Sequence, residues 1–327
     1  MRIFTWHTHG RYLQSLSNIS HEIFVPFKQD RSNHYVGRGD TYHLPRNVYE
    51  VPVDFIKDLE LDCIVFQSRE HYEVEQHWLL SPAQRKLPRV YIEHDPPLSH
   101  PTEAIHSVQD PDVLLVHVTH FNRLMWNSPG VRTVVIDHGV QMPAGVRYSG
   151  ELPSGIAAVN NIALRGRRLG FDVLQAVQAA APVHIVGMGA EAIGGPGEVA
   201  PLELAEYESH YRFFLNPMRW TSLSMAVCEA MHVGMPILGL ATTEMSTVIR
   251  NGVEGYIETD IDRLCEQARR LIADPQEAAE LGQRARETAQ RRFGIARFVA
   301  DWEAALALAT GASPPPAARS ELEVTVP

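Results

Sequence analysis

The chain has 327 residues, of which 45% are hydrophobic and 21% are charged, and its formal net charge is -10. A single hydrophobic core rarely grows to this length, so we expect two domains. The acidic balance excludes a broad nucleic-acid-binding face, because such a face needs many exposed cations. It leaves room for a small, locally basic pocket.

The cysteines and the apolar segments predict where the protein resides. Cys63, Cys228 and Cys265 are far apart and match no metal-ligand spacing, which favours reduced thiols in the cytoplasm. The first residues turn polar too soon for a signal peptide, and no apolar stretch approaches the ~20 residues of a membrane span. We therefore predict a cytoplasmic protein without a transmembrane segment, with peripheral association at the inner membrane surface left open.

The first half of the chain alternates short apolar strands with polar turns. A strand at Arg2–Trp6, a helix at Tyr12–Asn18 and a strand at His21–Val25 form a βαβ unit, which predicts a parallel sheet. Four more short, β-branched runs are expected strands: Cys63–Phe66, Arg89–Glu93, Val113–Val118 and Thr133–Ile136.

The pattern restarts after a segment rich in proline and glycine, Gln141–Pro153, which we interpret as a linker. The expected elements are strands at Gly155–Val159, Val183–Val186 and Pro236–Leu240, helices at Phe171–Ala180 and Ser224–His232, and three helices up to about residue 309. The sequence thus predicts an α/β protein with two doubly wound domains, at 1–145 and 146–310, and a disordered tail at 311–327. We leave open that the last helix of the second domain packs on the first domain.

The most informative stretch runs from Asn216 to Ile257. Small polar residues precede the expected helix, and Glu229 lies in its second turn. The free amides of Ser224 and Met225 at the helix N-terminus favour an anion, and a carboxylate one turn deeper suits a vicinal diol such as a ribose. Amides for phosphate and a carboxylate for sugar hydroxyls predict a nucleotide site.

The same stretch resembles the donor-site motif of the family-4 retaining glycosyltransferases, Pro-Ser-x-x-Glu-Gly-Phe-Gly-Leu-x-x-x-Glu-Ala-Met-Ala-x-Gly-x-Pro-Val. Glu229, Ala230, Met231, Gly234 and Pro236 are in register with it. The resemblance implies the GT-B architecture, in which two Rossmann-like domains face a central cleft. It also implies transfer from a nucleotide sugar with retention and without a metal, with Glu229 binding the ribose.

The motif is not fully kept. Its first glutamate, which approaches the transferred sugar in the family, is replaced by Thr221, and its Gly-Phe-Gly run is Ser222, Leu223 and Ser224. The resemblance assigns Thr221 to the transferred sugar, and Ser222, Ser224 and Met225 to the donor.

A second cluster follows the first strand of the expected donor domain. The family carries an arginine and a lysine there that bind the diphosphate, and these positions are Asn161 and Leu169 in this chain. Arg165, Arg167 and Arg168 are nearby cations that can supply the missing charge. The sequence does not decide which of them does so.

In the first domain the resemblance points to two positions. His94 follows the strand Arg89–Glu93, where the family often has a histidine near the donor sugar. A neutral imidazole at that place can donate a hydrogen bond to a hydroxyl. Gly10 lies in the loop that usually approaches the acceptor and the β-phosphate. His94 and Thr221 are therefore the expected catalytic residues.

Three other patterns are weaker. Gly187-x-Gly189-x-x-Ala192 fits a dinucleotide fingerprint, but glycines and a proline follow where its helix should run. Asp110-Pro111-Asp112 fits a metal-binding pair, but it precedes a strand. His7 and His9 with His94 lack a persuasive fourth zinc ligand. We expect no metal.

The sequence as a whole predicts a glycosyltransferase that moves a sugar from a nucleotide-diphosphate sugar, UDP- or GDP-linked, to a hydroxyl of a glycan, lipid or small molecule. No cofactor and no nucleic-acid partner are expected. Departures at 161, 169 and 221 leave a non-catalytic nucleotide- or glycan-binding relative as the alternative. A nucleotide-sugar isomerase on this fold would need an acid–base pair that the sequence does not offer.

Overall fold

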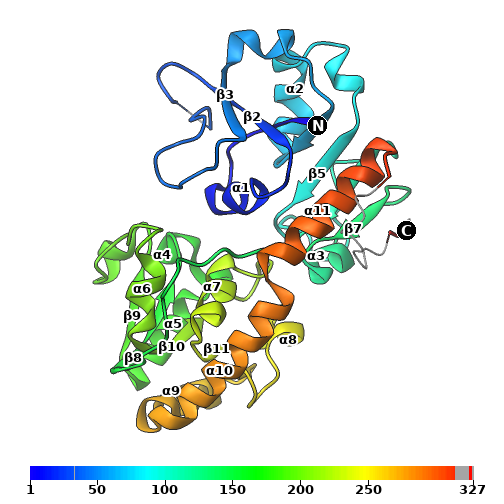
Figure 1. Cartoon of the computed structure of the whole chain (residues 1–327). Helices are drawn as coiled ribbons and strands as arrows, with labels where there is room; N and C mark the ends of the chain where they lie inside the picture. The colour runs from blue at the N-terminus through cyan, green and yellow to red at the C-terminus, as the bar shows by residue number, and fades with distance from the viewer. Residues whose placement is uncertain (33, 314–323, 326–327) are drawn as a thin grey trace. The chain divides into compact units, whose positions relative to one another are not determined.

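The computed structural model describes residues 1–32, 34–313 and 324–325. The chain forms two compact units, one made of Met1–Gly139 with Ile295–Pro327 and the other of Val140–Gly294. Each is built on a parallel sheet, of seven strands in unit 1 and five in unit 2 (Figure 1). Most of the predicted tail, 311–327, lies outside the described residues.

Unit 1 has the strand order β3-β2-β1-β4-β5-β6-β7, and every pairing is parallel. Its strands are β1 (Arg2–Thr5), β2 (Glu22–Phe27), β3 (Val48–Pro52), β4 (Cys63–Phe66), β5 (Arg89–Glu93), β6 (Val113–His117) and β7 (Thr133–Val135). Its helices are α1 (Gly10–Leu16), α2 (Gln76–Leu79), α3 (His120–Met125) and α11 (Ile295–Thr310), with short turns η1 (Val53–Asp58), η2 (His71–Glu75) and η3 (Gln84–Lys86).

Unit 2 has the order β12-β11-β10-β8-β9, again all parallel. Its strands are β8 (Leu152–Ala158), β9 (Val183–Val186), β10 (Tyr211–Asn216), β11 (Ile237–Leu240) and β12 (Gly255–Glu258). Its helices are α4 (Ile162–Arg165), α5 (Phe171–Ala180), α6 (Leu204–Ser209), α7 (Met225–Val233), α8 (Met245–Val248), α9 (Ile261–Ala273) and α10 (Pro275–Arg292), with turns η4 (Gly166–Leu169) and η5 (Ala190–Ile193).

The sheet of unit 2 is covered on both faces, as the apolar runs of its strands require. Ala157 of β8 and Leu215 of β10 pack in one apolar cluster with α5 and α9. Their neighbours Ile156 and Phe214 point the other way, into a cluster with α7 and α10. The predicted α/β fold with two doubly wound parallel sheets is confirmed.

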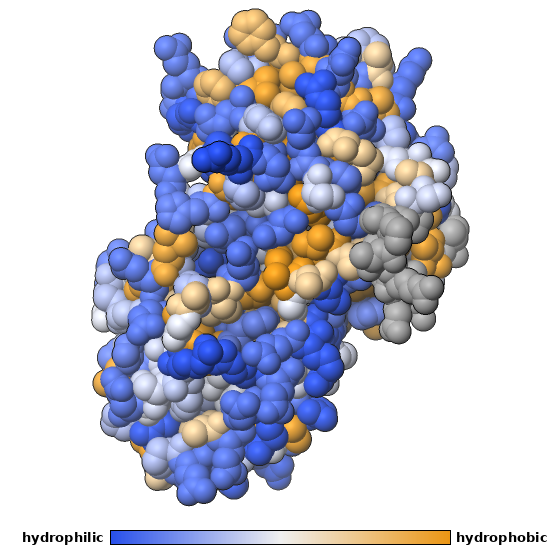
Figure 2. All heavy atoms as spheres, in the orientation of Figure 1, coloured by the Kyte–Doolittle hydropathy of each residue, from blue (hydrophilic) through white to orange (hydrophobic). Residues whose placement is uncertain are grey.

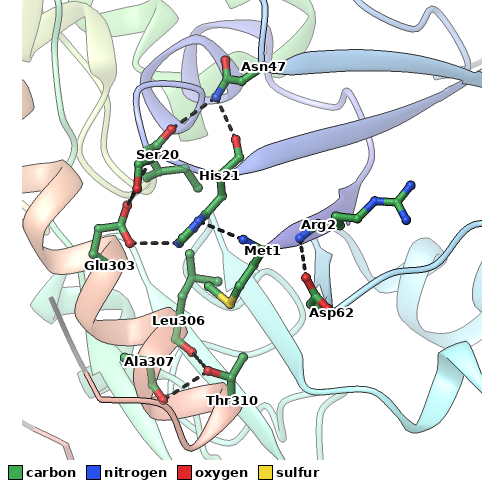
Figure 3. Close-up of polar contacts among 11 residues, drawn as sticks. Met1, Arg2, Ser20, His21, Asn47, Asp62, Glu303, Leu306, Ala307 and Thr310 are labelled. Carbon is green, nitrogen blue, oxygen red and sulfur yellow. Dashed lines mark hydrogen bonds and ion pairs between the residues drawn. The ribbon is translucent and has the colours of Figure 1, made fainter.

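Helix α11 is fastened to unit 1 by polar contacts as well as by apolar packing. The carboxylate of Glu303 accepts hydrogen bonds from the amide and the hydroxyl of Ser20, at 3.1 and 3.0 Å, and lies 2.9 Å from Nε2 of His21 (Figure 3). The indole of Trp302 donates to the hydroxyl of Tyr12 in α1. These contacts explain why the last helix is part of unit 1.

The strand predictions hold where apolar runs are short and uninterrupted, and three strands were missed: β3, β10 and β12. β10 has Arg212 as its second residue, which is buried and donates to the carbonyls of Gly150 and Ile272. β3 lies at the edge of its sheet, with Tyr49 exposed between buried Val48 and Val51. A charged residue hid β10 in the sequence, and polar alternation hid β3.

The outer surface of unit 2 is largely polar. In the view of Figure 2, hydrophilic residues cover most of the face of unit 2. Among the described residues, no helix is both long and apolar enough to cross a bilayer.

We predict that one buried histidine makes unit 1 sensitive to acid. His117 of β6 is 1% exposed, and burial lowers its pKa well below its ordinary value, helped by the nearby His106 imidazole and Arg123 guanidinium. The folded chain therefore leaves His117 neutral below pH 6.5, while the unfolded chain binds the proton. Stability falls as the pH drops, by at most about 1.4 kcal/mol at pH 5.5 for this group.

Urea unfolding at pH 7.5 and 5.5 measures this effect. His117→Leu should lose less stability between the two pH values than the wild type, whatever its stability at pH 7.5. Equal losses in the two proteins would contradict the assignment.

Candidate functional site

The loop between β10 and α7 forms the centre of the candidate site in unit 2. It leaves the sheet after Asn216 and enters α7 at Ser224, whose side chain accepts a hydrogen bond from the amide of Ala226 at 3.2 Å. Gly234 ends the helix in the left-handed conformation (φ 101°). Cap and terminator explain why the helix occupies only these nine residues.

Glu229 is on α7, one turn after its start, and only 6% of its surface is exposed. The amides of Ser224 and Met225 at the start of the same helix donate to no other residue in the part of the chain that the structure describes. Ser222 is buried and Thr221 is half-buried in the preceding loop. The helix dipole and the two amides favour an anion at this end.

The loop after β8 contains Asn161, which the sequence predicted to bind the donor. Asn161 adopts a left-handed conformation (φ 53°), and its amide donates to the carbonyl of Met188 at 2.6 Å. Its side-chain oxygen lies over Gly189, where an added Cβ atom would approach it to 2.8 Å. Asn161 therefore joins the loops after β8 and β9.

Leu169, at the other position where the family has a cation, fills the core. It is 1% exposed and packs in the apolar cluster of α5 and α9. Arg165 and Arg167 are exposed, and Arg168 is half-buried. Arg167 forms an ion pair of 2.6 Å with Asp172.

Gly170 brings this loop against the loop after β10. It has a φ of 77°, and a Cβ atom built on it would lie 1.8 Å from the carbonyl oxygen of Pro217. The carbonyl of Arg168 accepts hydrogen bonds from the amides of Arg219 at 3.0 Å and Trp220 at 3.2 Å. β8 and β10 are neighbours in the sheet, so their following loops meet at one edge.

Arg219 is a residue of this site that the sequence did not indicate. Its guanidinium binds both oxygens of Asp172, at 2.5 and 2.8 Å, and the carbonyl of Arg167 at 2.9 Å. These contacts hold the pKa of Asp172 below its usual range, mainly through the hydrogen bond from Arg219. In the motif Arg219 occupies a variable position, so no pattern marked it.

The glycines after β9 do not form a dinucleotide fingerprint. Gly187 and Gly189 have positive φ values, and the short turn η5 follows in place of a full helix. The amide of Met188 donates to the side chain of Asn160 at 2.9 Å. The glycines allow this close approach of two loops.

In unit 1, His94 follows β5 and packs among aromatic rings. Its ring centroid lies 4.3 Å from that of His9 and 4.9 Å from that of Tyr12. Burial lowers the pKa of His94 well below its ordinary value, and the nearby imidazoles of His9, His138 and His71 lower it further. His94 is therefore a neutral imidazole near pH 7, as the predicted hydrogen-bonding role requires.

Gly10 is the first residue of α1 and is closely covered. A Cβ atom on it would lie 2.3 Å from the ring of Tyr42 and 3.0 Å from Nε2 of His7. The need for glycine here is explained by this packing, and the predicted approach to a ligand stays a prediction.

The residues of the metal-binding alternatives lie as follows. Among the described residues, no group of three or more histidine, cysteine, aspartate or glutamate side chains is arranged to hold a metal ion. Asp110 precedes β6 and forms an ion pair of 2.8 Å with Arg89.

Comparison with known proteins agrees with this geometry. Residues 167–304 match the family described as "Glycosyl transferase-like". No curated protein matches the chain in a sequence search.

The fold is found in several solved structures. Sucrose-phosphate synthase from Thermosynechococcus elongatus is 15% identical, with a TM-score of 0.71 over 96% of this chain and 100% of its own. Anabaena HepE in complex with UDP-glucose is 14% identical, with a TM-score of 0.66 over 94% and 100%. A mutant of TarM from S. aureus, solved in a complex that includes UDP, is 12% identical, with a TM-score of 0.60 over 77% of this chain but only 57% of its own.

We predict that Gly170 is essential for the join between the two loops. Gly170→Ala adds a clash with the Pro217 carbonyl to the strain of a left-handed alanine, and should cost on the order of 3 kcal/mol or more. Gly194 is left-handed too (φ 84°), but no atom lies within 4 Å of an added Cβ, so Gly194→Ala should cost about 1 kcal/mol. Urea unfolding compares the two, and equal losses would rule out the contact as a constraint.

Proposed function

We propose that this chain transfers a sugar from a UDP-sugar to a hydroxyl group with retention. The premise is its GT-B fold and its glycosyl transferase-like second half, which confirm the predicted likeness to the family-4 glycosyltransferases. The observation that carries the proposal is the start of α7. Two free amides and a buried carboxylate one turn deeper lie there, at the carboxyl edge of a parallel sheet. Such an edge is where α/β proteins bind nucleotides.

The similar solved structures support uracil as the base of the donor nucleotide. HepE was solved with UDP and with UDP-glucose, and TarM with UDP. The sequence left UDP and GDP open, and these structures favour UDP for this chain. The acceptor stays a glycan, a lipid or a small molecule.

The proposed roles follow from charge and position. Glu229 binds the ribose hydroxyls, and the amides of Ser224 and Met225 with one arginine of 165–168 bind the diphosphate. Fixed donors of this kind stabilise the charge that develops on the leaving group. Thr221 and Ser222 contact the donor near its sugar, and the neutral imidazole of His94 donates to a sugar hydroxyl.

The proton of the acceptor hydroxyl needs no base from the chain. When the acceptor approaches on the face that the diphosphate leaves, a phosphate oxygen takes the proton as the new bond forms. The reaction then depends on positioning and charge.

We also propose a cytoplasmic location, supported by three buried cysteines, Cys63, Cys228 and Cys265, that form no disulfide.

A non-catalytic relative is the second candidate. This chain lacks both cations that the family places near the diphosphate. At their positions, Leu169 is buried in the core and Asn161 connects two loops. Such a protein would bind UDP and turn nothing over.

One experiment separates the candidates. The chain is incubated with UDP-, GDP-, ADP- and dTDP-sugars, and binding is followed by thermal shift while slow hydrolysis is followed by chromatography of the released sugar. We expect binding and slow hydrolysis of a UDP-sugar. Binding without hydrolysis or transfer supports the second candidate, and no binding of any nucleotide refutes both.

We predict that Glu229→Gln weakens UDP binding by 10- to 100-fold, because hydrogen bonds to a buried carboxylate contribute ~1.5–3 kcal/mol. The loss should be absent when 2′,3′-dideoxyuridine diphosphate replaces UDP, since this analogue lacks the diol. Glu266→Gln, an exposed change on α9, is the control and should bind like the wild type. A loss of equal size for the dideoxy analogue would exclude the ribose as the partner of Glu229.

A further inference from the structure

The turn that follows β8 differs from the family in where it carries cations for a diphosphate. With Asn161 bound to the loop after β9 and Leu169 in the core, neither of the two positions that carry the family's cations offers a charge. A diphosphate in this site still needs a cation, because amides alone do not neutralise it. The remaining arginines differ sharply in what they contact.

Arg167 is engaged elsewhere. Three quarters of its side chain is exposed, and its guanidinium lies 2.6 Å from the carboxylate of Asp172. Arg165 is exposed at the end of α4.

Arg168 is placed differently. It is half-buried, and in the described parts of the chain no residue forms a hydrogen bond or ion pair with its guanidinium. Its backbone is nevertheless firmly held, because its carbonyl accepts the amides of Arg219 and Trp220. These residues immediately precede Thr221, so the backbone of Arg168 is fixed to the loop between β10 and α7, which we call the motif loop.

Asp172 and Arg219 hold this arrangement together. Arg219 binds Asp172 through two parallel hydrogen bonds and reaches the carbonyl of Arg167 with the same guanidinium. The planar fork of arginine fits a carboxylate in one orientation, which a lysine does not reproduce. The pair therefore fixes the turn at 167–168 against the loop at 219–220.

We propose that Arg168 is the residue that binds the donor diphosphate, and that Asp172 and Arg219 are a positioning pair that holds it against the motif loop. This assignment rests on the proposed function and selects one arginine from the three. It gives Arg219 no direct contact with the donor. The missing cations of the family are thus replaced from a neighbouring position of the same turn.

The test compares UDP with uridine, which keeps the base and the ribose but lacks the phosphates. Affinities are measured by calorimetry for UDP and by ligand-detected NMR for uridine. Arg168→Gln should lower UDP affinity by 10- to 100-fold and leave uridine affinity unchanged. Unchanged uridine binding shows that the variant is folded.

Four further variants, one of them a control, check the positioning pair and the choice of arginine. Asp172→Asn and Arg219→Lys should each lower UDP affinity by about tenfold and spare uridine, although Arg219→Lys keeps its charge. Arg263→Gln, exposed at the start of α9, is the charge-matched control and should bind both ligands like the wild type. Arg167→Gln should have a much smaller effect than Arg168→Gln.

The outcomes distinguish this assignment from the proposed function. A wild-type chain that binds UDP with an Arg168→Gln variant that binds it equally well overturns the assignment alone, as does a larger loss in Arg167→Gln. Wild-type UDP affinity in Arg219→Lys overturns the positioning role. A wild-type chain that binds no nucleoside diphosphate overturns the proposed function and the assignment with it.

Discussion

The contact between the loops after β8 and β10 is the constraint on which the candidate donor site depends. The two strands are neighbours in a parallel sheet, so their loops leave the same edge. There the backbone of Gly170 lies against the carbonyl of Pro217 with no room for a side chain. The ion pair of Asp172 and Arg219 joins the same two loops a few residues further on. Every proposed donor contact in unit 2 is on one of these loops, or on the helix that the second of them starts.

The outline of both sheets could be predicted because short apolar strands carry their own signal. β4, β5 and β9 begin and end where the sequence predicted, and α5 does so too. α1 begins two residues early, because its first turn contains Gly10 and Arg11, which carry no apolar periodicity. β10 was hidden by Arg212, whose buried guanidinium is satisfied by carbonyls that lie about 60 residues away in sequence. Such compensation is invisible to any local pattern.

The site divides in the same way between local and distant signals. Glu229 and the start of α7 follow from a cap, a helix and a glycine within one short segment. The pair of Asp172 and Arg219 spans 47 residues, and nothing in either segment announces the other. Which arginine is available depends on these partners, so the sequence could name the cluster of 165, 167 and 168 but not choose within it. The glycine at 170 was aligned, but its reason, the Pro217 carbonyl, is a tertiary contact.

The geometry of η4 explains how a leucine can replace a cation without removing the charge. In a turn with three residues per revolution, neighbouring side chains point about 120° apart. Once Leu169 fills the core between α5 and α9, the residue before it must point away from that core. The carbonyl of Arg168 is anchored by two amides of the motif loop, which limits the directions its side chain can take. An apolar residue at 169 then strengthens the packing of the turn and leaves a cation at 168. The arrangement works only while Asp172 and Arg219 keep the two loops in register.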